Sequence, residues 1–114
     1  MKLDSAIFYT TSINKIANFY TNLIELKVEY RDGDDYVSFL FDNGVRLGIK
    51  KANIDREKVG SQSIIVQVEN IEDIYQKLRQ KDINFCEKLS KESWGITFSI
   101  FDLDNNKIEF LERS

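Results

Sequence analysis

Two segments of the chain repeat apolar residues at the spacing of an α-helix. From Ile13 to Glu25 apolar residues recur every three or four positions, and Ser12 stands where a helix N-cap is expected. The segment from Asn70 to Asp82 repeats the pattern, with Asn70 at the cap position and Asp73 three residues later. Both segments predict amphipathic helices that begin with a side-chain cap.

Residues typical of β-strands precede and follow each predicted helix. Asn43-Gly44 joins two such runs and is a strong signal for a hairpin, and the polar residues 102–106 join another two. Each half of the chain therefore predicts one strand, one helix and three further strands. The expected strands are residues 6–10, 28–30, 36–41, 45–50, 63–68, 85–87, 95–101 and 107–112.

The two halves resemble each other residue by residue. With an offset of 58 residues, Ile13 aligns with Ile71 and Ile16 with Ile74, which is typical of an internal duplication. The pattern predicts one α+β domain over residues 1–114, made of two tandem βαβββ modules that form a curved mixed sheet around a cleft, with the helices on the outer face. The modules are expected at about 1–50 and 61–112, joined by the polar linker 51–60.

Strand alternation predicts which side chains face this cleft. Ile108 and Phe110 are expected to pack on the second helix, so their neighbours face the other way. The residues expected in the cleft are Ser5, Ile7, Tyr9, Phe39, Phe41, Arg46, Gly48, Lys50, Ser63, Ile65, Gln67, Thr97, Ser99, Phe101, Lys107, Glu109 and Leu111.

Composition narrows the range of functions. The net charge of −3 without a long basic run argues against nucleic acid as a partner, and the short apolar runs argue against a membrane span or a secretory signal. Cys86 is the single cysteine; we expect it to be buried in a strand, and a lone thiol fits the reducing cytoplasm. The chain has no histidine, so it lacks the commonest general base and the commonest ligand for transition metals. A serine–histidine–acid hydrolase is therefore excluded.

Particular motifs resemble a known family. Ile16-Ala17-Asn18-Phe19-Tyr20 followed by Leu23-Ile24-Glu25-Leu26 is similar to the helix motif of the glyoxalase, bleomycin-resistance and extradiol-dioxygenase proteins, the vicinal oxygen chelate superfamily. Trp94-Gly95 and the ending from Phe101 to Phe110 are similar to that family's tryptophan–glycine loop and C-terminal motif. The resemblance covers nearly the whole chain and is nearest to bleomycin-resistance-like members. It implies the duplicated fold, a small-molecule ligand and a homodimer.

The resemblance also implies where a metal ion would be bound. The family's four ligand positions correspond to Ser5, Gly48, Ser63 and Glu109, of which only Glu109 offers a good ligand. One carboxylate does not hold a transition metal firmly, so we expect no metal and no other cofactor. The similarity of Asp102–Asn106 to a calcium loop is superficial, because the glycine and glutamate of such loops are out of place, and a polar hairpin turn is expected.

The sequence predicts a metal-free protein that sequesters an apolar or aromatic ligand in its cleft. The alternative is a glyoxalase-like lyase or isomerase that uses Glu109 as its base or as part of a weak metal site. Glu109 could equally be a remnant of a lost metal site that nearby cations neutralise. The aromatic residues could also simply fill the cleft, and the chain would then be a scaffold that associates with another protein. The expected ligand-binding residues are Tyr9, Phe39, Phe41, Arg46, Lys50, Trp94, Phe101 and Glu109.

Overall fold

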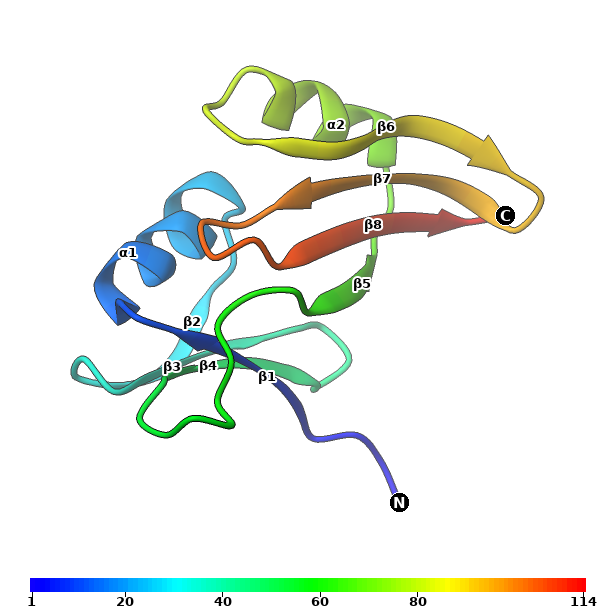
Figure 1. Ribbon diagram of the computed structural model, residues 1–114. Helices are drawn as coiled ribbons and strands as arrows, with labels where there is room; N and C mark the ends of the chain where they lie inside the picture. The colour runs from blue at the N-terminus through cyan, green and yellow to red at the C-terminus, as the bar shows by residue number, and fades with distance from the viewer. The chain divides into compact units, whose positions relative to one another are not determined.

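The first half of the chain builds a four-stranded mixed sheet with a helix on one face (Figure 1). In the computed structural model, which describes residues 1–114, this unit comprises Met1–Gly60. The strand order is β1-β4-β3-β2, with β1 parallel to β4 and the other pairs antiparallel. Its elements are β1 (Ser5–Thr10), α1 (Ile13–Asn18), the π-helical turn η1 (Phe19–Leu23), β2 (Val28–Asp32), β3 (Tyr36–Leu40) and β4 (Arg46–Lys51).

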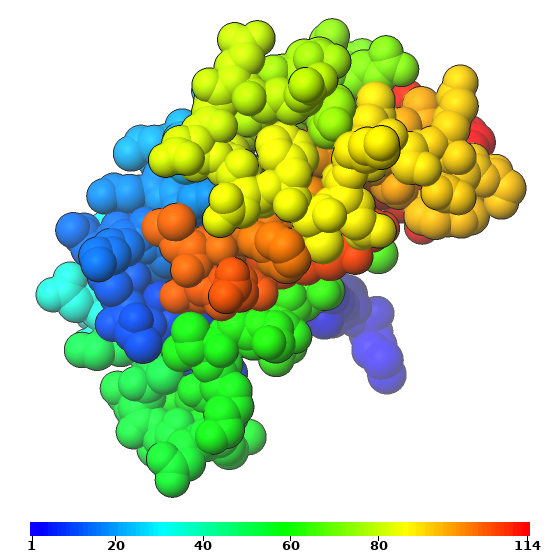
Figure 2. All heavy atoms as spheres, turned by 45° about the horizontal axis from the view of Figure 1, so that its top comes forward, coloured from blue at the N-terminus to red at the C-terminus, as the bar shows by residue number.

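The second unit, Ser61–Ser114, repeats this arrangement. Its strand order, β5-β8-β7-β6, is equivalent to that of the first sheet, and β5 is parallel to β8. The predicted α+β fold with two tandem βαβββ modules is confirmed. The elements of this unit are β5 (Ser63–Gln67), α2 (Ile71–Arg79), β6 (Phe85–Glu92), β7 (Gly95–Phe101) and β8 (Lys107–Arg113). Figure 2 shows β6, coloured yellow, at the surface beside the orange β7, with which it pairs.

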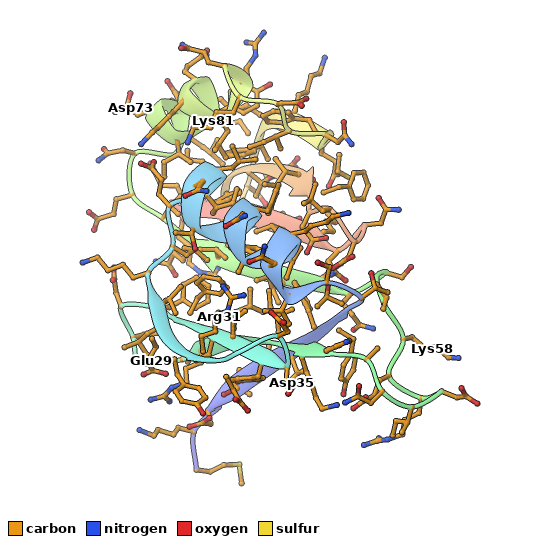
Figure 3. The ribbon with its side chains drawn as sticks, turned by 90° about the vertical axis from the view of Figure 1, so that its left-hand side faces the viewer. Glu29, Arg31, Asp35, Lys58, Asp73 and Lys81 are labelled. Atoms are coloured by element: carbon orange, nitrogen blue, oxygen red, sulfur yellow. The ribbon has the colours of Figure 1, made fainter.

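Each unit has its own apolar core between the helix and the sheet. In the second unit the rings of Phe98 and Phe110 stack with centroids 4.8 Å apart, and Ile108 is buried with them, as predicted. In the first unit Arg31 lies on the helix side of β2 and its Nη2 donates a hydrogen bond to Asn14 Oδ1 at 3.3 Å (Figure 3). The buried core residues of the first unit include Phe8, Ile13, Ile16, Tyr20, Val37, Phe39, Leu47 and Ile49.

The two helices begin in different ways. Ser12 Oγ accepts a hydrogen bond from the Lys15 backbone N–H at 3.4 Å, which confirms the predicted cap of α1. The predicted cap of α2 is wrong, because Asn70 has a left-handed backbone (φ 58°) and its side chain makes no capping hydrogen bond. The Ile71 N–H donates instead to Glu112 Oε1 on β8 at 2.9 Å. A carboxylate distant in sequence therefore caps this helix.

The predicted first helix divides into two parts. Its α-helical part ends at Asn18, and the π-helical turn of residues 19–23 follows. Glu25 then has a φ of 65°, the left-handed conformation that commonly ends a helix. The Leu26 N–H donates to Tyr20 O at 2.9 Å across this end.

Neither helix of the chain is long and apolar enough to span a membrane.

The polar segment that follows β4 is attached to the first unit. Glu57 is buried, and its carboxylate accepts hydrogen bonds from Lys50 Nζ on β4 and from the Asn53 N–H. The Ala52 N–H donates to Thr10 O on β1 at 2.9 Å. Lys58 projects outward beyond these contacts (Figure 3). The segment is thus held by specific hydrogen bonds within the unit.

Candidate functional site

The face of the first sheet opposite α1 is its open face. The register places Ser5 beside Arg46 and Tyr9 beside Lys50, and Ile7 on this face is 40% exposed while its neighbour Phe8 is buried in the core. The predicted orientation of β1 and β4 is therefore confirmed. The side chains of this open face are Ser5, Ile7 and Tyr9 on β1, Arg46 and Lys50 on β4, and Tyr36, Ser38 and Leu40 on β3.

The prediction for the third strand is wrong. Phe39 is fully buried on the helix side, opposite Leu47, and its ring lies 5.6 Å from that of Tyr20 on η1. It cannot line the open face. Phe41 is partly buried, lies one residue beyond β3, and its N–H donates to Val45 O at the start of the hairpin turn. In a strand with apolar or aromatic residues at nearly every position, the pattern alone does not tell the two faces apart.

Tyr36 lies across Gly48 of the neighbouring strand. A Cβ atom built on Gly48 would clash with the Tyr36 hydroxyl and would lie only 2.7 Å from Ile7 Cδ1 and 3.0 Å from Tyr36 Cζ. The Tyr30 ring on β2 lies 6.3 Å from the Tyr36 ring. The two tyrosines thus form an aromatic surface that the sequence analysis does not identify. The residues of β3 give no clear signal for this surface, because apolar or aromatic side chains occur on both faces of the strand.

The two cations of this face are already paired. Arg46 Nε donates to Glu29 Oε1 at 2.5 Å, and its Nη1 lies 3.2 Å from Asp4 Oδ1. The hydrogen bond and charge of Glu29 raise the pKa of Arg46. Lys50 Nζ lies 2.8 Å from Glu57 Oε2, and this hydrogen bond is the largest cause of the lowered pKa of Glu57. Arg46 and Lys50 therefore face the predicted side but hold carboxylates of their own unit.

The open face of the second sheet agrees with the prediction on all three strands. Ser99 is paired with Glu109, and Phe101 with Lys107, on the face opposite α2. Ile65 on β5 lies beside Glu109 in the register and is 64% exposed. The predicted residues that this face brings together are Ser63, Ile65, Gln67, Thr97, Ser99, Phe101, Lys107, Glu109 and Leu111.

A chain of polar contacts crosses this face. Lys107 Nζ lies 2.8 Å from Glu87 Oε1 and 3.7 Å from Glu109 Oε1. The fully buried Ser99 hydroxyl donates to Glu87 Oε1 at 2.9 Å. The hydrogen bond with Lys107 is the main cause of the lowered pKa of Glu87, and the same bond raises the pKa of Lys107. Glu109, the candidate base, is thus part of a network that includes Glu87, a residue the sequence analysis places on a strand but not in the site.

The first unit does not supply metal ligands at the two positions that the family resemblance assigns to it. The hydroxyl of Ser5 donates to Asp4 Oδ2 at 2.6 Å. Gly48 has no side chain, and the Tyr36 ring covers it. These residues do not fit a transition-metal site.

The second unit offers one carboxylate at its two positions. Ser63 contributes a weakly coordinating hydroxyl, and Glu109 lies near the Lys107 ammonium, whose charge opposes a metal cation. No group of three or more histidine, cysteine, aspartate or glutamate side chains is placed to hold a metal ion.

Trp94 lies outside the network, and Cys86 contributes only the last of the electrostatic effects that raise the pKa of Lys107. Trp94 is in the turn between β6 and β7 and is 48% exposed. The ends of β6, β7 and β8 near this turn surround a depression of about 300 Å³. Cys86 on β6 is exposed, so the prediction that it is buried is wrong. The reason is that β6 is an edge strand, and only some of its residues contact the core.

Several solved structures share this fold at low sequence identity. TnmS3, an antibiotic binding protein from Streptomyces sp. CB03234, has a TM-score of 0.84 and 13% identity, with 100% of this chain and 97% of that one covered. The lactoylglutathione lyase from Agrobacterium tumefaciens has a TM-score of 0.82 and 13% identity, with 97% and 92% covered. The oxidase ChaP-H2 has a TM-score of 0.81 and 16% identity, with 100% and 94% covered. Since one fold supports such different proteins, these similarities establish the fold alone.

The sequence itself identifies the family. A comparison with curated proteins finds no match. The family model for glyoxalase-like domains, however, matches residues 3–113, which is nearly the whole chain. The resemblance to the vicinal oxygen chelate superfamily is therefore confirmed, and this chain belongs to the family of glyoxalase-like domains.

Proposed function

We propose that this chain binds a small organic molecule without a metal ion, with the open face of its second sheet as the main binding surface. The observation that carries the proposal is the position of Ile65 beside Glu109 on neighbouring strands. An apolar side chain that is 64% exposed lies next to a carboxylate whose side chain is only 19% exposed. This combination suits a ligand with an apolar or aromatic body and one polar group.

Two aromatic residues of the second unit extend this surface. Phe101 on the same face supplies an aromatic ring, and Trp94 at the end of the sheet supplies a second one. The open face of the first sheet, taken by itself, offers aromatic surface at Tyr9 and the Tyr30–Tyr36 pair, while its Arg46 and Lys50 orient polar groups only if they exchange their present partners. The antibiotic-binding function of TnmS3 is consistent with this proposal.

A pair of isoleucines allows a matched test. Ile65 lies on the open face, whereas Ile54 lies outside the strands and is 57% exposed. The probe is the uncharged dye N-phenyl-1-naphthylamine, followed by its own emission and by that of Trp94, the chain's single tryptophan. We expect saturable binding that weakens about tenfold in Ile65→Ser, because buried apolar area is lost, and is unchanged in Ile54→Ser. Absence of saturable binding, or equal losses in both variants, contradicts the proposal.

The lyase or isomerase alternative is tested on the same samples. Glu109 would act as a base, so turnover in a lactoylglutathione lyase assay that is lost in Glu109→Gln would replace the binding proposal.

We further propose that the protein is a cytoplasmic homodimer; the exposed thiol of Cys86 fits a reducing compartment. Light scattering should give twice the mass of one chain, and the mass of a single chain would contradict the dimer.

A further inference from the structure

A lysine lies between two carboxylates on the open face of the second sheet. Lys107 on β8 contacts Glu87 on β6 at 2.8 Å and Glu109 on its own strand at 3.7 Å. These distances join Nζ to Oε1 in both cases. The two acids come from strands separated by β7, and the lysine connects them across it. An ammonium group therefore occupies the place that a shared cation would take between these carboxylates.

The arrangement is built into the sheet. Ser99 on the intervening strand is fully buried and donates to the same Glu87 oxygen that Lys107 contacts, which fixes that carboxylate from a second side. The pKa of Lys107 is raised and that of Glu87 is lowered, mainly by their mutual hydrogen bond, so both groups are charged at neutral pH. The Lys107 side chain is 31% exposed, which reduces screening of its charge by water.

This cation lies next to the one carboxylate at the family's metal-ligand positions. A divalent ion at Glu109 would have to approach an ammonium held within 4 Å of that carboxylate, and like charges at this separation repel strongly. Without the ammonium, the same face would offer two carboxylates and the Ser99 hydroxyl, an all-oxygen set that suits hard divalent cations.

We propose that Lys107 is a built-in counter-ion, which satisfies Glu87 and Glu109 in place of a metal and keeps divalent cations away from this face. The inference builds on the metal-free binding function and extends it by naming the residue responsible. In this role Lys107 does more than form a surface ion pair, because it determines that the face excludes divalent cations and stays open to organic ligands.

Manganese binding tests the proposal directly. Mn²⁺ is titrated by electron paramagnetic resonance into the wild-type chain, Lys107→Met and Lys88→Met. Lys88 is an exposed lysine of β6, so its replacement removes the same charge at another position. We expect Mn²⁺ to bind Lys107→Met at least about tenfold more tightly than the other two chains, because a unit charge beside the carboxylates is removed. In Lys107→Met/Glu109→Gln the gain should disappear.

Two results would overturn the proposal. One is a folded Lys107→Met chain, checked by circular dichroism, that binds Mn²⁺ no better than Lys88→Met. The other is wild-type binding of Mn²⁺ that Glu109→Gln abolishes. If Lys107→Met does not fold, Lys107→Gln takes its place with the same expectation. The readout is independent of the dye titration, so failure of the organic ligand to bind leaves this test unaffected.

Discussion

Tyr36 occupies the space that a side chain at position 48 would need. Its ring crosses Gly48, so that a Cβ atom there would clash with the hydroxyl and approach Cζ to 3.0 Å. Position 48 is one of the four at which metal-dependent relatives are expected to carry a ligand. In this chain the ends of the Tyr36 and Ile7 side chains fill that space, and a side chain at position 48 would have to displace them.

Gly48→Ala should therefore destabilise the protein. Alanine in a strand is normally favoured over glycine by about 0.5–1 kcal/mol, but here the added methyl overpacks the Tyr36 ring, and we expect a net loss of about 1–3 kcal/mol. Urea unfolding measures the change. In a Tyr36→Ala background the same substitution should be neutral or stabilising, and equal losses in both backgrounds would contradict the packing explanation.

Helix α2 should depend on Glu112 rather than on Asn70. Glu112→Ala removes the acceptor of the Ile71 N–H, a loss of about 1 kcal/mol for a helix cap. Asn70→Gly should be neutral, because Asn70 has a left-handed backbone and makes no side-chain cap. Thermal unfolding compares the variants, and hydrogen exchange at the Ile71 amide should quicken in Glu112→Ala only. A larger loss in Asn70→Gly would restore the cap predicted from the sequence.

In the turn between β7 and β8, Asn105→Ala should lower the stability of the protein more than Asn105→Gly does. This residue has a φ of 64°, so Asn105→Ala should cost about 1 kcal/mol while Asn105→Gly should be tolerated. Asp102 anchors the same turn by accepting hydrogen bonds from the N–H groups of Asp104 at 2.8 Å and Asn106 at 2.9 Å. Asp102→Ala should therefore cost about 1–3 kcal/mol. Urea midpoints test all three, and equal effects of alanine and glycine at position 105 would argue against a backbone origin.

Acid should weaken the attachment of the segment after β4. The pKa of Glu57 is lowered below its ordinary 4.5, first by the hydrogen bond from Lys50 and next by that from Asn53. Because this carboxyl is more acidic in the folded chain, its contribution to stability is complete above the pKa of the unfolded state and is lost as pH falls through the lower folded-state pKa. Unfolding free energies below about pH 5 should decline less steeply in Glu57→Gln than in the wild type. Asp55→Asn, at an exposed carboxylate of the same segment, is the matched control.

The amino-acid pattern determines most of this fold. Helix and strand periodicities and the turn signals depend on residues close together in sequence, and together with the internal repeat they identify two βαβββ units. Alternation also orients β4, β7 and β8, since one face of each strand is clearly more apolar.

Where both faces of a strand carry apolar residues, pairing with the neighbouring strand determines which face is buried. Phe39 is buried because β3 pairs with β4 in the register that sets it opposite Leu47, and the residues of β3 alone contain no such information. Contacts between distant residues are likewise set by the tertiary structure. Glu112 caps Ile71, Tyr36 covers Gly48, and Lys107 joins Glu87 to Glu109 only because strand pairing brings them together. The sequence determines the elements, and the faces of those strands that alternate clearly, through local periodicity, whereas the chemistry of the site depends on the packing of those elements.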